Sequence, residues 1–522
     1  MKLRAFPALF VCVVLGALVL RGARLSLRPM HHDEANQALK FGGLLETGDY
    51  RYDPREHHGP TLYYMTLPLA EAAGARSLAD VNETLLRLVP AIFGTGLILL
   101  FLLFRGGLAR ESIACAAVLA ALSPLMTYYS RFYIQESLLV FFTAGLMAAG
   151  WRYVRTRSVS SAAAAGFFAG LAFATKETSL IIFTALLAGV AAAVIAGRGG
   201  ARPPGRAPAA LALHAAVFLA TALAVATLFF TSFLSNLSGL ADSVRAFGVY
   251  AGRGLEGGAH AHPWWYYAKL LLWTRYGRGP VWSEAFVMAL AVAGAIAAFG
   301  RDAGKEGNPS FIRFLLGYTL AAGAAFSLIP YKTPWNAMPF YLGVILLAGH
   351  GAGLLWRVSR FPAVKLAMLA LLLPGLFNLG LQDFRANFLD YADTSNPYVY
   401  AQTGKDLLRL ARTVEGVAEA AGGHENLLVA VIAPAEETWP LPWYLRRFVL
   451  VGYWNEFDPA GPAGKAEVVI CSLAAAARFQ SAAGTGFVAS FYELRPGVLL
   501  ELFVRSDVWD AYLDRKALKK AT

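Results

Sequence analysis

The sequence is poor in the residues that build disulfide frameworks, metal sites and solvated surfaces. Only three of its 522 residues are cysteine and only 15% are charged, against roughly a quarter charged in an average soluble domain. Cys12, Cys115 and Cys471 have no CxxC spacing, so we expect neither a structural metal nor redox chemistry. A glycine-rich phosphate loop ending in Gly-Lys-Ser or Gly-Lys-Thr is also missing. We therefore do not expect transport powered by nucleotide hydrolysis in this chain alone.

Long apolar runs dominate instead, and hydrophobic residues make up 57% of the chain. Eleven runs are long enough, or nearly so, to cross about 30 Å of hydrocarbon. They cover residues 6–20, 88–104, 112–127, 137–151, 162–174, 179–196, 209–230, 285–299, 311–329, 337–356 and 364–381. We therefore expect an α-helical polytopic membrane protein with about eleven transmembrane helices. The first run alternatively fits a cleaved signal peptide, because basic residues precede a short apolar core.

The net charge of +12 is a topology signal. Basic residues gather in alternate connectors, and the positive-inside rule places these connectors in the cytoplasm together with the N-terminus. They are Lys2, Arg4, Arg105, Arg110, Arg152, Arg155, Arg157, Arg198, Arg202, Arg206, Arg301, Lys305, Arg313, Arg357, Arg360 and Lys365. Because the connectors account for the basic excess, we expect no nucleic-acid partner. An odd number of spans leaves the loops 21–87 and 232–283 and the C-terminal segment outside, most simply in a plasma or inner membrane.

The external segments have their own patterns. Residues 61–73 and 263–273 are apolar and aromatic but too short to span, so they predict helices that lie at the membrane interface or pack against neighbouring spans. Beyond a transmembrane domain of residues 1–381, residues 382–522 predict an external soluble α/β domain. Apolar residues there have helical spacing over 407–417, and β-rich runs follow at 427–432, 449–454, 468–471 and 498–504.

Ionisable residues flank the outer ends of the predicted spans, where they are unfavourable near lipid and therefore indicate function. They are Asp33, Glu34, His57, His58, Arg131, Glu136, Lys176, Glu177 and Lys332. We expect them to converge in one outward-facing cavity suited to a lipid-borne substrate. For Asp33 a structural interpretation stays open, because an aspartate just before residues 35–45 also caps a helix.

The order of these motifs resembles the GT-C membrane glycosyltransferases, in particular the protein O-mannosyltransferase and aminoarabinose-transferase branch. The matching features are Asp33-Glu34-Ala35, Pro60 to Tyr64, Ser130 to Glu136, Ala174 to Glu177 and Ser327 to Trp335. Within that superfamily the chain is most similar to the flippase-activity-associated proteins. Their external tail carries segments like Trp439 to Arg446 and Leu494 to Gly497.

The resemblance implies an inverting transfer from a polyprenyl-phosphate sugar to a glycan, lipid or protein acceptor. Asp33 would be the general base, a role worth roughly 10² to 10⁴ in rate. Glu34 and Glu136 would orient its partners or hold a divalent cation, the one cofactor left open. Other implied roles are binding of the donor phosphate by Arg131, Lys176, Lys332 and His58, and binding of substrate by Tyr63, Tyr133, Glu177 and Trp335.

Two departures from the family pattern and one alternative function remain. His58-Gly59-Pro60 stands where the aminoarabinose transferases have Lys-Pro-Pro, and the second-loop acid is Glu136 where many relatives have an aspartate. The alternative is a translocator or accessory factor for lipid-linked glycans. In the external domain, aromatic residues suit either sugar binding or core packing; they are Trp439, Trp443, Tyr444 and Trp454.

Overall fold

The computed structural model describes residues 5–55, 58–197, 208–256, 258–299, 307–358 and 361–521. The chain forms two compact units. We call Met1–Leu25, Thr47–Ala73 and Thr84–Tyr400 the membrane unit, and Ser26–Glu46, Gly74–Glu83 and Ala401–Thr522 the α/β unit. Several residues named above lie outside the described residues: Lys2, Arg4, His57, Arg198, Arg202, Arg206, Arg301, Lys305 and Arg360.

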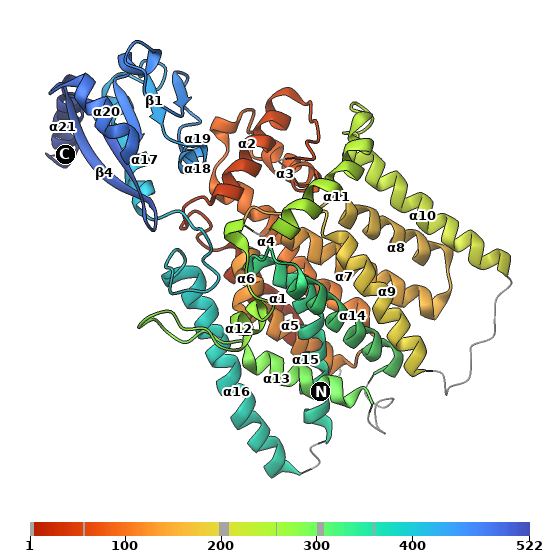
Figure 1. Ribbon diagram of the computed structural model, residues 1–522. Helices are drawn as coiled ribbons and strands as arrows, with labels where there is room; N and C mark the ends of the chain where they lie inside the picture. The colour runs from red at the N-terminus through yellow and green to blue at the C-terminus, as the bar shows by residue number, and fades with distance from the viewer. Residues whose placement is uncertain are drawn as a thin grey trace. The chain divides into compact units, whose positions relative to one another are not determined.

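Helices build nearly all of the membrane unit (Figure 1). In chain order they are α1 (Ala5–Gly22), α3 (Thr61–Ala72), α4 (Glu83–Leu100), η2 (Phe101–Phe104), α5 (Arg110–Leu122), α6 (Pro124–Tyr129), α7 (Glu136–Thr156), α8 (Val159–Phe173), α9 (Ser179–Ala196), α10 (Pro208–Phe230), α11 (Ser238–Glu256), η3 (Gly258–His260), α12 (Tyr266–Leu272), α13 (Ala285–Ala297), α14 (Pro309–Leu328), η5 (Pro334–Ala337), α15 (Met338–Val358), α16 (Pro362–Phe384) and η6 (Arg385–Leu389). The predicted domain boundary after residue 381 falls inside α16, and the two units separate after Tyr400.

Seven helices in the described part of the chain are long and apolar enough to cross a membrane. Three further apolar helices are shorter, at Phe6–Gly22, Val159–Phe173 and Ala285–Ala297. The predicted helical membrane protein is therefore confirmed, while the number of eleven spans stays a prediction. The run 112–127 is not one helix, because the chain breaks at Ser123 and restarts at Pro124, the first residue of α6. The Ser123 hydroxyl accepts the Met126 N–H and caps this new helix.

Contacts at the helix ends separate two sides of the membrane unit. The basic connectors meet one another, since Arg155 donates to the Arg105 carbonyl, Arg313 donates to the Ala196 carbonyl, and Arg357 pairs with Glu111. At the opposite ends of α7, α8 and α14 lie Glu136, Lys176 and Lys332, respectively. The alternation of connectors read from the charges is therefore present in the packing of the helices.

Small residues allow close helix packing in this unit. On α8, Gly166 and Gly170 are one turn apart and both face the backbone of α10. A Cβ atom would lie 2.3 Å from the Phe218 carbonyl oxygen at Gly166, and 2.6 Å from the Ala222 carbonyl oxygen at Gly170. This spacing is the Gly-xxx-Gly pattern that brings two helix backbones together in lipid.

The α/β unit contains a five-stranded mixed sheet of order β2-β1-β3-β5-β4. Its strands are β1 (Val429–Ile432), β2 (Val451–Trp454), β3 (Val468–Ser472), β4 (Phe487–Arg495) and β5 (Val498–Arg505). The first three are parallel to one another, and β5 is antiparallel to both β3 and β4. Its helices are α2 (His32–Thr47), η1 (Leu78–Asp80), α17 (Asp406–Ala420), α18 (Ala435–Thr438), α19 (Leu441–Tyr444), η7 (Pro462–Lys465), α20 (Leu473–Ala483) and α21 (Ser506–Ala521).

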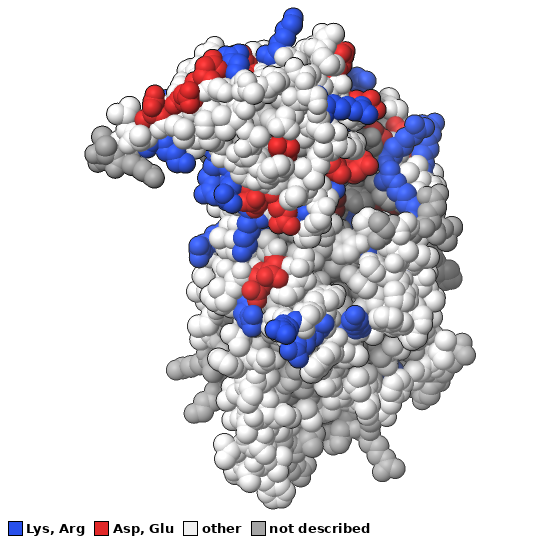
Figure 2. All heavy atoms as spheres, turned by 60° about the vertical axis from the view of Figure 1, so that its left-hand side comes forward, with Lys and Arg blue, Asp and Glu red and all other residues white. Residues whose placement is uncertain are grey.

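Each face of this sheet has its own core. Leu407 and Leu410 of α17 and Val508 of α21 pack with Val429 and Val431 on one face. Ala475 and Phe479 of α20 pack with Ala430, Ile432 and Val469 on the other. The predicted helix and four predicted strands are all present, and β4 is an additional strand. Figure 2 shows acidic and basic side chains of this unit interspersed on its surface, and long stretches of uncharged surface over the helices of the membrane unit.

Part of the loop 21–87 belongs to the α/β unit. The Tyr444 hydroxyl accepts the Met30 N–H at 2.8 Å, and the side chain of Thr403 donates to the Met30 carbonyl at 2.7 Å. Arg446 donates to the carbonyls of Leu78 and Val81. These contacts attach residues 26–46 and 74–83 to the C-terminal sheet domain, whereas residues 47–73 belong to the membrane unit.

Candidate functional site

His58 and Glu177 form the first polar cluster of the membrane unit. His58 Nδ1 lies 2.7 Å from Glu177 Oε2, and the Tyr52 hydroxyl donates to Glu177 Oε1 at 3.1 Å. Burial of this carboxylate opposes its ionisation, but the charge of His58 and its hydrogen bond outweigh burial, so the pKa of Glu177 is lowered. Burial and the same carboxylate raise the pKa of Tyr52 far above its usual range. Glu177 is therefore held as an anion.

Lys176 and Glu136 form the second cluster, from the next residue of the same loop. The Lys176 ammonium donates to Glu136 Oε1, and both side chains are buried. Glu136 begins α7, where a negative charge is favoured by the helix dipole. Two adjacent residues of the loop after α8 thus hold two separate charged partners, one before α3 and one on α7.

Gly59, in the segment His58-Gly59-Pro60, lies in close contact with the loop after α8. A Cβ atom at this position would lie 2.2 Å from the Ala174 carbonyl oxygen. The Thr61 N–H donates to the same carbonyl at 3.3 Å, so the start of α3 lies directly against the loop after α8. Glycine is therefore required at this position, and the close approach holds His58 beside Glu177.

Lys332 has a buried ammonium group, which donates to the carbonyls of His262 at 2.9 Å and Ile329 at 2.5 Å. Burial lowers the pKa of Lys332. The segment around it pairs with a loop that sequence analysis passed over, which carries His260 and His262. His260 Nδ1 lies 2.6 Å from the Tyr400 hydroxyl, and the His262 ring stacks on Tyr266. The spacing His-Ala-His in an outer loop was the sequence signal for this cluster.

Arg131 lies at the end of α1. Its guanidinium donates to the carbonyls of Leu20, Arg21 and Ala23 at 2.7, 3.1 and 2.8 Å, and it stacks on Phe388. These carbonyls end a helix and lack intrahelical donors, so Arg131 acts as a C-cap. Its predicted contact with the donor phosphate stays a prediction, and the contacts above give Arg131 a structural role.

The predicted substrate-binding aromatic residues are all buried. The Tyr133 hydroxyl bonds with Thr66 Oγ1 at 2.9 Å, and Tyr63 packs against Tyr50 with ring centroids 5.3 Å apart. Trp335 packs edge-on against Tyr129. Of the two predicted interfacial helices, α3 turns Tyr63 inward, whereas the residues before α12 leave Trp264 71% exposed. Interfacial exposure therefore fits only the second segment.

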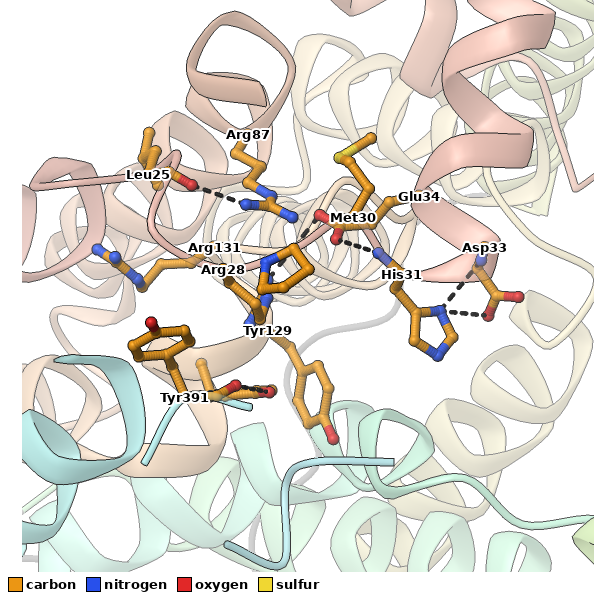
Figure 3. Close-up of polar contacts among 12 residues, drawn as sticks. Leu25, Arg28, Met30, His31, Asp33, Glu34, Arg87, Tyr129, Arg131 and Tyr391 are labelled. Carbon is orange, nitrogen blue, oxygen red and sulfur yellow. Dashed lines mark hydrogen bonds and ion pairs between the residues drawn. The ribbon is translucent and has the colours of Figure 1, made fainter. Parts of the chain in front are cut away.

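Asp33 and Glu34 lie in the α/β unit, at the start of α2, and point in different directions (Figure 3). Glu34 is fully buried, accepts the His31 N–H at 3.1 Å and lies 3.9 Å from Arg28. The Asp33 N–H donates to His31 Nδ1 at 3.0 Å. The His31 ring thus caps the second helical N–H, that of Asp33, while Glu34 accepts the His31 N–H, an arrangement close to a capping box with histidine in place of serine or threonine.

The Asp33 carboxylate takes no part in this cap. Its side chain is 44% exposed, and its Oδ2 atom lies 3.9 Å from the Nδ1 atom of His31. The structural interpretation of Asp33 as a helix cap is wrong, because α2 begins at His32 and its cap comes from other side chains. The predicted meeting of Asp33 with Glu136 and Lys332 joins the two units and stays a prediction.

A further carboxylate escaped sequence analysis. Glu284, just before α13, is fully buried and accepts hydrogen bonds from Ser123 Oγ at 2.7 Å and the Tyr398 hydroxyl at 2.8 Å. It also bonds to the hydroxyl of Tyr341. Since Glu284 flanks the outer end of the run 285–299, the criterion that selected the other acids also applied to it. Its partners come from several segments, which indicates a structural role.

No three histidine, cysteine, aspartate or glutamate side chains come together as a metal site within the described ranges. The possible divalent cation stays a prediction.

The four aromatic residues singled out in the C-terminal domain divide into two pairs. Trp443 and Tyr444 are structural, because the Trp443 indole donates to Glu83 at 2.7 Å under the Arg446 guanidinium, and Tyr444 holds Met30. Trp439 and Trp454 line a surface pocket.

The family model for dolichyl-phosphate-mannose-protein mannosyltransferase matches residues 61–198, the segment that holds Glu136, Lys176 and Glu177. Among solved structures, ArnT from Cupriavidus metallidurans in the apo state is 15% identical, with a TM-score of 0.62 over 96% of this chain and 98% of that chain. ArnT bound to undecaprenyl phosphate is 14% identical, with a TM-score of 0.60 over 97% of this chain and 99% of that chain. The chain has the fold of GT-C membrane glycosyltransferases.

The oligosaccharyltransferase of Archaeoglobus fulgidus shares this fold over part of its length. In the form tethered to an acceptor peptide it is 15% identical, with a TM-score of 0.58 over 86% of this chain. The present chain spans 64% of that protein. No curated protein sequence matches the chain significantly.

Proposed function

We propose that this chain is an inverting glycosyltransferase that moves a sugar from a polyprenyl-phosphate donor to an acceptor hydroxyl at the outer face of the membrane. The observation that carries the proposal is the pair of charged clusters in the membrane unit. His58 with Glu177 and Lys176 with Glu136 unite three outer segments at one end of the helices. In a GT-C fold, such a concentration of charge at helix ends indicates a site for the reacting headgroup.

The chemistry requires a base and a stabilised leaving group. The acceptor oxygen attacks the anomeric carbon, its proton passes to the Asp33 carboxylate, and the bond from the anomeric carbon to the phosphate oxygen breaks. The electron pair of that bond remains on the lipid phosphate. Asp33 suits the base role because its carboxylate is 44% exposed and is not used by the cap of α2.

Cationic groups would stabilise the phosphate as its charge grows. In the membrane unit His58 and Lys176 are the candidates, each already oriented by a glutamate. Lys332 is a third, and its ammonium group would have to exchange one carbonyl for a phosphate oxygen. Arg131 is left out of this donor site because α1 carbonyls occupy it. A lipid-phosphate donor is supported by ArnT bound to undecaprenyl phosphate and by the archaeal oligosaccharyltransferase in complex with a dolichol-phosphate.

The position of the ion pairs favours transfer over translocation of lipid-linked glycans. Within the described segments, no ion pair lies in the middle of a helix that is apolar enough to span: the pairs of the membrane unit lie at helix ends, in loops, or, for Arg245 with Asp242, inside α11. Transporters instead place ionisable groups near the bilayer midplane. We further propose that the N-terminus is cytoplasmic and that the α/β unit is external, as the basic connectors indicate.

The test is transfer in proteoliposomes that contain the full chain, a radiolabelled polyprenyl-phosphate hexose and a panel of lipid, glycan and peptide acceptors. We expect label on one acceptor class and equimolar release of polyprenyl phosphate. In parallel, a fluorescent lipid-linked sugar reports scrambling between leaflets. Scrambling without any transfer would reject the enzymatic function and support the translocator.

A further inference from the structure

A pocket lies on the α/β unit, beyond the carboxyl ends of the parallel strands β1 and β2. It measures about 240 Å³, and its polar and aromatic lining is made by Thr438, Trp439, Tyr453, Trp454 and Asn455. Trp454 is the last residue of β2 and pairs with Ile432, the last residue of β1. The carboxyl ends of parallel strands are where α/β sheets commonly bind ligands.

The lining selects an uncharged ligand. Three aromatic side chains, one amide and one hydroxyl border the pocket, and none of its lining residues is charged. The Thr438 hydroxyl donates to the carbonyl of Pro434 at 3.1 Å, which leaves its oxygen able to accept a hydrogen bond. Flat apolar faces next to a few donors and acceptors match a sugar ring, which has C–H faces and a rim of hydroxyls.

The local backbone holds the Trp454 indole in place. A Cβ atom on Gly452 would lie 2.1 Å from the far edge of this indole, so the ring lies flat across the glycine two residues before it. Residues two apart on a strand share one face of the sheet. Glycine at 452 therefore sets the orientation of one wall of the pocket.

The pocket adjoins the residue proposed as the base. The His32 ring stacks on Trp439 with centroids 5.3 Å apart and an angle of 20° between the rings. His32 immediately precedes Asp33, and both residues belong to the same α/β unit as the pocket. A sugar held against Trp439 and Trp454 therefore lies close to the first turn of α2.

We propose that this pocket binds a neutral sugar residue of the acceptor and presents one of its hydroxyls toward Asp33. The inference rests on the proposed function and specifies its acceptor as a glycan or glycolipid. Trp439 and Trp454 form the sugar platform, and Tyr453 and Asn455 bind its rim.

Saturation-transfer NMR on the full chain in nanodiscs tests the pocket without any donor lipid. The probes are neutral methyl glycosides and disaccharides of mannose, glucose, galactose and N-acetylglucosamine, with an uncharged serine- and threonine-containing peptide beside them. We expect at least one glycoside to bind, and Trp454→Ala or Trp439→Ala to weaken it about tenfold. Trp509→Ala is the matched control, since Trp509 is a partly buried tryptophan of the same unit outside the pocket.

Gly452→Ala provides a second, milder variant, because it displaces the Trp454 indole but removes no lining side chain. We expect weaker glycoside binding with an unchanged circular-dichroism spectrum. Absence of glycoside binding to the wild-type chain overturns the proposal, as does equal binding by the Trp454→Ala and Trp509→Ala variants. Peptide binding that depends on Trp454 would show that the pocket binds a peptide and would overturn the assignment of a sugar. Asp33→Asn should leave glycoside binding intact, so failure of the base role is distinguishable from failure of the pocket.

Discussion

The Asp33 backbone N–H donates to the Nδ1 atom of His31, so the histidine ring and not the Asp33 carboxylate caps α2. His31 therefore has a structural role at the start of α2, whereas the Asp33 carboxylate is not needed for the fold of this helix. His31 and Glu34 hold the helix start, while Asp33 keeps its carboxylate available to a substrate.

We expect Asp33→Asn to reduce sugar transfer about 10² to 10⁴-fold with no loss of thermal stability, because only the proton acceptor is removed. Transfer of labelled sugar and the Tm of the purified chain are measured together. His31→Ala should show the converse, with the fold destabilised by about 0.5–2 kcal/mol through loss of the cap. Asp49→Asn, an exposed acid of the same outer loop, is the matched control. Full activity of the Asp33→Asn variant would remove it from the base role.

We expect Lys176→Met to destabilise the membrane unit by about 3–5 kcal/mol, because it leaves the buried Glu136 carboxylate without its partner. The double variant Lys176→Met with Glu136→Leu should recover most of that stability, as an apolar pair needs no compensation. Thermal unfolding in detergent measures both. The double variant is expected to fold and to lack sugar transfer. If it is fully active, the pair has a structural role only.

The close approach at Gly59 gives a steric prediction. Gly59→Ala should destabilise the chain by about 1–3 kcal/mol, because the new methyl group overlaps the Ala174 carbonyl. It should also separate His58 from Glu177 and lower transfer. Gly150→Ala is the control, since nothing lies within 4 Å of a Cβ atom there. Equal Tm values for the two variants would contradict the packing of α3 against this loop.

Burial lowers the pKa of His32 from its ordinary 6.5, despite the opposing charge of Asp33. The unfolded chain therefore takes up this proton at a higher pH than the folded chain, and the stabilisation by neutral His32 decreases as the pH falls through and below 6.5. His32→Phe keeps a ring against Trp439 and cannot titrate. We expect the wild type to lose more Tm than His32→Phe between pH 7.5 and 5.5. Parallel loss in both proteins would show that the fold does not lower the pKa of His32.

Much of this architecture follows from local sequence. The apolar runs and the strand at 468–471 depend on neighbouring residues, and the described part of the chain forms helices over the runs and a strand at 468–472, although the run 112–127 breaks into α5 and α6. The assignment of residues 26–46 to the C-terminal unit does not follow from local sequence. The partners of Met30 are Thr403 and Tyr444, which are more than 370 residues away. Periodicity carries no information on such contacts.

Within the candidate site, the sequence pattern likewise indicates some contacts and carries no information on others. The pairing of Lys176 with Glu136 was within reach, since both flank outer ends of predicted spans. The capture of Arg131 by α1 carbonyls was not, because a guanidinium looks the same in sequence whether it binds a phosphate or a helix end. Buried Glu284 shows the opposite limit: it flanks the end of a predicted span, as the candidate site residues do, yet its contacts indicate a structural role.

The attachment of α2 to the C-terminal segment sets an order of events during synthesis. Residues 30–34 leave the ribosome long before Thr403, Trp439 and Tyr444 exist to hold them. The nascent chain has only the local cap of α2, from His31 and Glu34, and that helix gains its C-terminal anchor only when translation has passed residue 444. If Asp33 is the base, as proposed, a chain stalled before that point carries a proton acceptor that the C-terminal segment has not yet anchored.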